Sequence, residues 1–163
     1  LTTIDILKKF HPIKISQMQI KNGLKKTQWS GRFQFISKNV LVDCAHNPSG
    51  FDVLRKELLI IRSQKRIKKF IFVIGILKDK NIKTMLKIMF RLILKIIFTK
   101  SRHEKASKPQ YLLKIFNRIN KNKSIKTKII ENPKKALNYA KKIAGKDDLV
   151  VVTGSIYMVG EII

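Results

Sequence analysis

The sequence predicts an α/β domain with a mostly parallel sheet of about six strands and helices on both faces. Three observations predict this fold. Short apolar, β-branched segments alternate along the chain with longer segments whose apolar residues recur at helical spacing. Turn-forming Asn-Pro pairs and glycines separate these segments. The 163 residues are enough for one ordinary domain with its own hydrophobic core.

The first 28 residues differ from the rest because they offer two short helices and no strand. Apolar residues between Ile4 and Phe10 predict an amphipathic helix that His11-Pro12 ends. Residues 15–24 predict a second helix, which Gly23 weakens. Two such helices cannot bury a core alone. We therefore expect them to lie outside the domain core and to dock on a segment that precedes them in a longer protein.

Six apolar segments predict the strands of the sheet. They are residues 33–36, 40–44, 70–74, 95–99, 126–130 and 148–153. Four of them are strongly apolar and should occupy the centre, where helices cover both faces; these are 40–44, 70–74, 95–99 and 148–153. Val42, Val73 and Val151 should then be buried, and the segment at 126–130 is the weaker strand.

Four amphipathic helices should follow these strands. Their apolar faces are Phe51, Leu54, Leu58 and Ile61; Ile82, Met85, Leu86 and Met89; Leu112, Leu113, Phe116 and Ile119; and Ala136, Leu137, Ala140 and Ile143. Ser49 is expected to cap the first, and Asp79 stands before the second. Pro109 and Asn132-Pro133 suit the starts of the others, and Gly154-Ser155 begins a terminal helix. The pattern predicts a Rossmann-like domain.

The charge of the chain is extreme, with 36 Lys and Arg against 10 Asp and Glu, formally +26. Such a balance raises the alternative of a small basic nucleic-acid-binding module. The lysines, however, are spread through every segment and are not interleaved with aromatic residues. We interpret the charge as codon drift in an AT-rich genome and expect no specific nucleic-acid partner. Non-specific phosphate binding at low salt is still expected.

Cysteine and hydropathy indicate the compartment. Cys44 is the single cysteine, so no internal disulfide can form, which fits a reducing compartment. A small buried residue at a strand end is its simplest interpretation. No segment approaches the roughly 18 apolar residues of a membrane span, and the first residues do not resemble a signal peptide. We expect a cytoplasmic protein with no membrane partner.

Polar side chains gather in four turns that follow predicted strands, at 43–50, 75–80, 99–108 and 153–155. Right-handed βαβ connections bring the carboxyl ends of parallel strands to one edge, where open α/β sheets bind ligands. The candidate residues on this edge are Asp43, His46, Asn47, Lys78, Asp79, Lys80, His103 and Ser155.

Each candidate has a functional and a structural interpretation. His46 could orient a substrate or act as acid or base, although a histidine in a turn is often structural. Ser155 could place an anion at a helix start, or it could cap that helix. Asp43 could bind a ribose hydroxyl or an amine, or it could cap the turn. The chain shows no metal-ligand spacing, no catalytic triad, no P-loop and no G-x-G-x-x-G.

Four motifs resemble one family in order and spacing. They are W-S-G-R-F-Q at 29–34, V-D-C-A-H-N-P at 42–48, G-I-L-K-D-K at 75–80 and T-G-S-I-Y-M-V-G-E at 153–161. Residues 29–163 resemble the carboxyl-terminal domain of folylpolyglutamate synthase, often bifunctional with dihydrofolate synthase, in the Mur ligase superfamily. Residues 1–28 resemble the tail of the preceding ATPase domain plus its linker. Ser30 and Cys44 depart from the proline and glycine usual in the family.

The resemblance implies an ATP-dependent ligase. Such enzymes phosphorylate the terminal carboxylate of a folate or dihydropteroate, and the amine of L-glutamate displaces phosphate to form an amide. It implies that Arg32 and Asp43 contact the nucleotide, that His46 and Ser155 bind glutamate with His46 catalytic, and that Lys78 to Lys80 form a loop behind them.

The family binds ATP and Mg²⁺ mainly through an amino-terminal P-loop domain, which this sequence does not contain. We therefore expect the chain alone to be inactive, and we expect a monomer. A Mur-type ligase domain acting on a peptidoglycan precursor is the alternative within the superfamily.

Overall fold

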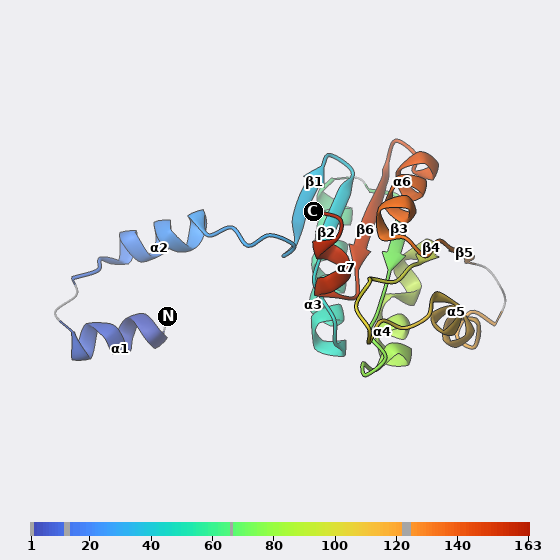
Figure 1. Cartoon of the computed structure of the whole chain (residues 1–163). Helices are drawn as coiled ribbons and strands as arrows, with labels where there is room; N and C mark the ends of the chain where they lie inside the picture. The colour runs from blue at the N-terminus through green and yellow to red at the C-terminus, as the bar shows by residue number, and fades with distance from the viewer. Residues whose placement is uncertain (1, 12–13, 66, 122–124) are drawn as a thin grey trace.

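The computed structural model describes residues 2–11, 14–65, 67–121 and 125–163. Its centre is a six-stranded sheet in the order β1-β2-β6-β3-β4-β5 (Figure 1). β1 runs antiparallel to β2, and every other neighbouring pair is parallel. The strands are β1 Gln34–Ser37, β2 Val40–Asp43, β3 Lys69–Ile74, β4 Ile93–Phe98, β5 Lys126–Ile129 and β6 Asp148–Thr153. The predicted mostly parallel α/β sheet is confirmed.

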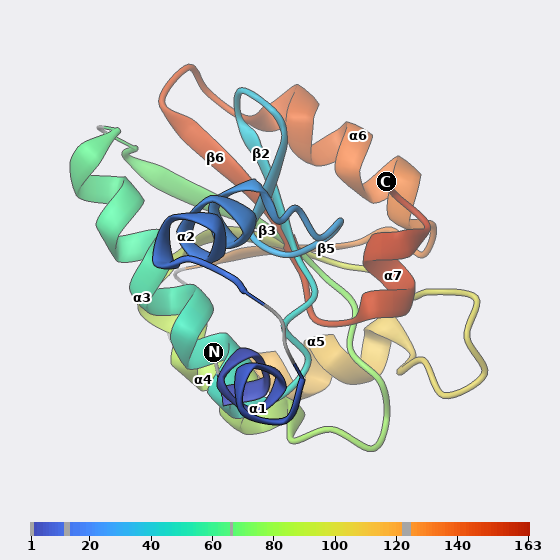
Figure 2. The same cartoon turned by 90° about the vertical axis from the view of Figure 1, so that its left-hand side faces the viewer.

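Helices α3 to α7 cover both faces of the sheet. They are α3 Pro48–Gln64, α4 Ile82–Met89, α5 Pro109–Asn117, α6 Pro133–Ile143 and α7 Ile156–Gly160, with a short 3₁₀ turn, η1 Phe90–Leu92, before β4. Two further helices, α1 Thr2–Phe10 and α2 Gln17–Lys26, precede the domain. The buried residues of α3, α4 and α5 share one hydrophobic cluster, and those of α6 and α7 share another. The two layers are visible on opposite sides of the sheet in Figure 2.

Alternation along β6 shows how the central strands serve both clusters. Leu149 and Val151 belong to the cluster under α3 to α5, whereas Val150 and Val152 belong to the cluster under α6 and α7. Because both faces are covered, a central strand must be apolar throughout. The predicted burial of Val42, Val73 and Val151 is confirmed, since each is 0% exposed.

The predicted Ser49 cap is wrong, whereas Asp79 stands before its helix as predicted. Helix α3 starts at Pro48, and its cap is Asn47, whose Oδ1 accepts the Gly50 N–H at 2.7 Å. Ser49 therefore lies inside the first turn and does not cap it. Helix α4 is capped by Asn81, whose side chain accepts the Thr84 N–H, so Asp79 lies outside the helix. In both cases an asparagine side chain satisfies the free N–H groups of the first turn.

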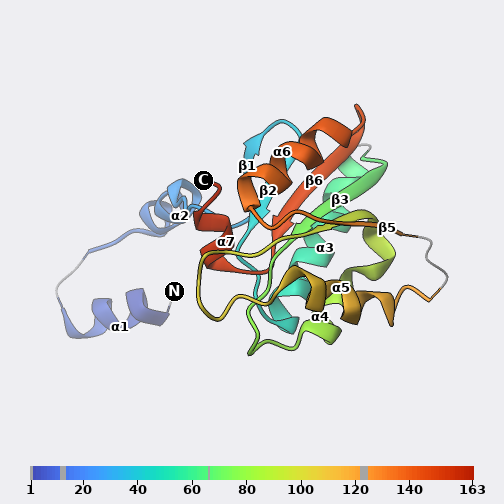
Figure 3. The same cartoon turned by 45° about the vertical axis from the view of Figure 1, so that its right-hand side comes forward.

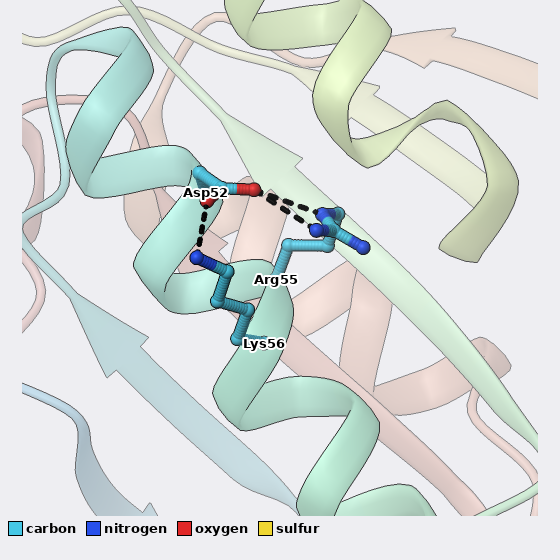
Figure 4. Close-up of polar contacts among 3 residues, drawn as sticks. All are labelled: Asp52, Arg55 and Lys56. Carbon is cyan, nitrogen blue, oxygen red and sulfur yellow. Dashed lines mark hydrogen bonds and ion pairs between the residues drawn. The ribbon is translucent and has the colours of Figure 1, made fainter.

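The solvent face of α3 carries a local ionic cluster (Figure 4). Asp52 accepts hydrogen bonds from Arg55 at 2.9 Å and pairs with Lys56 at 2.8 Å. These bonds, first that from Lys56 and then that from Arg55, hold the pKa of Asp52 below its ordinary value. The three side chains stand at i, i+3 and i+4, the spacing that brings residues onto one helix face. Such exposed pairs contribute little to stability.

Helices α1 and α2 extend away from the domain (Figure 1). Ile20 is the one buried residue in their described parts. Ile6, Phe10, Met18 and Leu24 are all more than half exposed. No residue of these helices belongs to either core cluster. Their interpretation as the tail of a preceding domain stays a prediction.

The exposed lysines lie on all sides of the domain. Lys105 follows β4, Lys146 precedes β6, Lys114 is on α5 and Lys141 is on α6. Lys105 and Lys146 lie at opposite edges of the sheet, and Lys114 and Lys141 lie on helices that cover opposite faces. A basic nucleic-acid-binding module should present one contiguous positive face. The dispersed arrangement is the one expected from drift in composition.

None of the helices in the described ranges is long and apolar enough to span a bilayer.

Candidate functional site

A pocket of about 320 Å³ lies where the parallel strands end. All four of the turns singled out from the sequence contribute to it. Five of the eight candidate residues line it, namely His46, Asp79, Lys80, His103 and Ser155. Asp43, Asn47 and Lys78 are not part of its lining. A wider hollow of about 720 Å³ lies at the opposite edge, before the strands begin. Ligands of open α/β sheets bind at the carboxyl edge, so the smaller pocket is the candidate site.

Close backbone packing brings these turns together. Gly154 has φ of +113°, and a Cβ there would lie 2.6 Å from the carbonyl oxygen of Gly75. A Cβ on Gly75 would in turn lie 3.0 Å from the Thr99 carbonyl oxygen. The Gly154 N–H also donates to the Ala45 carbonyl at 3.0 Å. The turns after β2, β3, β4 and β6 therefore touch through backbone, which requires glycine at 154 and leaves little room for a side chain at 75.

His46 is held in a defined tautomer by the turn after β2. Its Nδ1 lies 2.9 Å from the carbonyl oxygen of Cys44. A carbonyl only accepts, so Nδ1 carries the proton and donates. The other ring nitrogen, Nε2, is then unprotonated in the neutral imidazole and can accept a proton. His46 is half-buried in the pocket wall, as a general base would be.

Ser155 supplies a buried hydroxyl without a partner. The residue is 2% exposed, and within the described residues its Oγ has no hydrogen-bond partner. It occupies the N-cap position of α7 but makes no capping bond. The cap interpretation is therefore wrong, because the side chain does not reach the helix N–H groups. Helix α7 has only five residues, so its dipole offers little to an anion. A buried unpaired hydroxyl calls for an explanation, and Ser155 belongs to the lining of the pocket, where a ligand would supply the missing partner.

The remaining polar residues add positive charge to the pocket. Lys80 pairs with Asp79 at 2.8 Å and holds the pKa of that carboxyl below its ordinary value. Lys105 is exposed at the rim, and its backbone N–H donates to Nδ1 of His103 at 3.1 Å. The His103 ring packs on the ring of Tyr157 with 4.0 Å between centroids. The lining thus combines two imidazoles and two ammonium groups against one carboxylate.

Asp43 and Arg32 lie in a neighbouring turn. Asp43 accepts two backbone N–H groups, from Ala45 at 2.8 Å and from Phe33 at 2.9 Å. The second bond holds Phe33 at φ of +44°, a region that non-glycine residues rarely adopt. The carboxylate therefore joins the end of β2 to the turn that carries Arg32. The Arg32 side chain is exposed.

The same turn packs closely on Cys44. The Cys44 N–H donates to the Gly31 carbonyl at 2.8 Å, and a Cβ on Gly31 would lie 2.8 Å from the Cys44 sulfur. Burial, and next the charge of Asp43, raise the pKa of the Cys44 thiol, although Arg32 opposes them. A buried thiol with a raised pKa is a packing residue.

One family matches most of the chain. The family described as "Dihydrofolate synthetase, C-terminal domain" matches residues 32–163. The chain belongs to this family. The predicted family is thereby confirmed, and the match favours a folate ligase over a peptidoglycan-precursor ligase.

Curated relatives of this family domain are longer proteins. The dihydrofolate synthase/folylpolyglutamate synthase of Bacillus subtilis is 27% identical over 150 residues, which cover 91% of this chain and 33% of the relative. The protein of the same name from Buchnera aphidicola subsp. Schizaphis graminum is 26% identical over 151 residues, covering 91% and 34%. The chain thus spans about a third of the curated relatives that it matches.

Solved structures share the fold. Escherichia coli FolC in complex with DHPP and ADP superimposes with a TM-score of 0.79 at 23% identity, covering 92% of this chain and 34% of that one. The bifunctional folylpolyglutamate synthase/dihydrofolate synthase of Yersinia pestis, complexed with AMPPNP and Mn, gives 0.79 at 22% identity, with coverage of 92% and 34%. At this identity the likeness establishes the fold of the family domain.

Lys105 and Tyr157 line the pocket of this family domain although the sequence did not single them out. Tyr157 stands two residues after Ser155, within the last motif, and Lys105 stands two residues after His103. Their closeness in sequence to His103 and Ser155 is the signal by which both residues could have been predicted. Among the described residues no group of three or more His, Cys, Asp or Glu could hold a metal ion.

Proposed function

We propose that this chain is the carboxyl-terminal domain of an ATP-dependent ligase that adds L-glutamate to folate or dihydropteroate. The single observation that carries the proposal is the pocket of a folate-ligase family domain in which His46 and the unpaired Ser155 hydroxyl meet. Glutamate brings two carboxylates and one ammonium group. Lys80 and Lys105 offer cations for carboxylates, and His46 offers a proton acceptor for the ammonium.

The proposed reaction has two steps. ATP phosphorylates the terminal carboxylate of the acceptor and gives an acyl phosphate. His46 Nε2 then takes one proton from the glutamate ammonium, so that the neutral amine attacks the acyl carbon. Phosphate leaves with the bonding electron pair and takes up the second proton that the new amide nitrogen loses. Ser155 orients the incoming glutamate. A bifunctional folylpolyglutamate synthase/dihydrofolate synthase has been solved with Mn, AMPPNP and L-glutamate bound, which supports these substrates for the family.

Nucleotide contacts from this domain would come from Arg32 and Asp43. The Arg32 guanidinium is exposed, and each Asp43 oxygen accepts one N–H, which leaves a lone pair for a ribose hydroxyl. In the proposed enzyme Mg²⁺ would be held mainly by an amino-terminal P-loop domain. The isolated chain would therefore be inactive. We propose a cytoplasmic, monomeric enzyme.

The Ser155→Ala variant tests the pocket assignment. Because the hydroxyl has no partner within the described residues, its removal should leave the thermal midpoint unchanged or slightly raised. In the full-length ligase the glutamate KM should rise about tenfold while the ATP KM stays constant. Ser63→Ala on α3, which removes a hydroxyl bonded only to its own helix, is the matched control. Loss of stability without a change in glutamate KM would make Ser155 structural and refute its assigned role.

A further inference from the structure

The loop at 99–108 forms one wall of the pocket through His103 and Lys105. Its start is fixed by Thr99, whose hydroxyl donates to the Glu131 carbonyl at 2.7 Å. Its end is fixed from Lys105 onward, where the Lys78 N–H donates to the Lys105 carbonyl at 2.8 Å and the Ser107 N–H donates to the Ile76 carbonyl at 3.0 Å. Between these two points the loop runs beside α7 (Figure 3).

Helix α7 contacts this part of the loop twice. Tyr157 packs its ring on His103. Glu161 accepts the backbone N–H of Arg102 at 2.6 Å through Oε1, across 59 residues of sequence. Tyr157 and Glu161 stand four residues apart, and the Glu161 N–H donates to the Tyr157 carbonyl at 3.3 Å. Residues at i and i+4 share a helix face, so both side chains point toward the loop.

The helix α7 does not itself stabilise the carboxylate of Glu161. A carboxylate at a helix end faces carbonyl oxygens and gains nothing from them. Within the described residues Glu161 forms no ion pair, and its bond to Arg102 goes to the peptide N–H. A charge-assisted bond to a backbone N–H fixes the path of the loop independently of the Arg102 side chain.

We propose that Glu161 is a positioning residue, which holds the 99–108 loop against α7 at Arg102 so that His103 forms the wall of the glutamate pocket. This assignment rests on the proposed function for its ligand. The hold of Glu161 on the loop can be tested whatever the ligand is, because the bond from Arg102 to Glu161 lies within this chain. Glu161 lies outside the lining of the pocket and acts through Arg102.

The first arm measures amide exchange in the 163-residue chain. In Glu161→Ala the Arg102 amide should exchange about tenfold faster, because it loses its acceptor. Glu161→Gln keeps an acceptor oxygen and should restore most of the protection. Glu104→Ala is the matched control, since it removes a glutamate from the loop itself, where among the described residues only the backbone carbonyl of Glu104 accepts a hydrogen bond. Amides of β3 should stay protected in every variant, which separates loop release from unfolding.

The second arm measures kinetics in the full-length ligase. Glu161→Ala should raise the glutamate KM by about tenfold and leave the ATP KM constant, with Glu161→Gln close to wild type. An unchanged Arg102 amide, an unchanged glutamate KM, or an equal rise in both KM values would overturn the proposal. A wild-type protein without ligase activity would refute the proposed function instead. Exchange of the Arg102 amide would still decide whether Glu161 holds the loop.

Discussion

Replacing His46 by alanine in the full-length ligase is expected to lower kcat/KM for glutamate by at least about a hundredfold, the usual contribution of a general base. The ATP KM should stay nearly constant, because His46 lines the pocket whereas Arg32 and Asp43, the proposed nucleotide contacts, are not part of its lining. The Cys44 carbonyl fixes Nδ1 as the protonated nitrogen, so Nε2 is the base. Steady-state kinetics with each substrate varied in turn provides the measurement.

Two further variants sharpen this result. His46→Gln keeps a hydrogen-bonding side chain but cannot take up a proton, so it should lose kcat while recovering part of the glutamate affinity. His11→Ala, in the segment after α1, is the control for loss of a histidine remote from the pocket. An effect of His46→Ala on the ATP KM alone would make the division of roles wrong while leaving the family assignment intact.

The second large effect is expected at Asp43. Its carboxylate accepts two backbone N–H groups, so Asp43→Ala should leave both unpaired and lower the free energy of unfolding by about 2 to 3 kcal/mol. The turn that carries Arg32 would also loosen, because the bond to the Phe33 N–H would be lost. The ATP KM of the full-length ligase should then rise, with the glutamate KM little changed. Chemical denaturation and kinetics measure the two effects.

Arg32→Ala separates the two roles of this turn. The exposed guanidinium makes no hydrogen bond or ion pair in the described structure, so stability should change by less than about 0.5 kcal/mol. The ATP KM should still rise, as in Asp43→Ala. If Arg32→Ala left the ATP KM unchanged, the turn would not contact the nucleotide, and Asp43 would be a purely structural residue.

The sequence predicted the sheet well because burial on both faces leaves a clear pattern. Val40 to Val42 and Phe70 to Ile74 are apolar at every position, and only a central strand demands that. Pro109 and Asn132-Pro133 marked helix starts correctly, since proline fits the first turn and asparagine caps it. Strand ends then predicted which turns share an edge.

Details that depend on side-chain competition were not predictable. At Asn47 and Ser49 two good caps stood close together, and the choice of Asn47 depends on the path of the turn after β2. Phe33 adopts a positive φ, and its N–H donates to Asp43, ten residues away, a contact that the local sequence does not predict. Glu161 pairs with Arg102 across 59 residues, a contact that no local pattern encodes. The site could be placed on an edge, but not its internal contacts.

The central claim is tested most directly by glutamate ligation in the full-length protein. With ATP, Mg²⁺ and labelled L-glutamate, that protein should convert folate or dihydropteroate to a product longer by one glutamate, and release one phosphate per amide formed. The isolated 163-residue chain should form none under the same conditions. Full-length protein that hydrolyses ATP but joins glutamate to neither acceptor, or ligation by the isolated chain, would contradict the account.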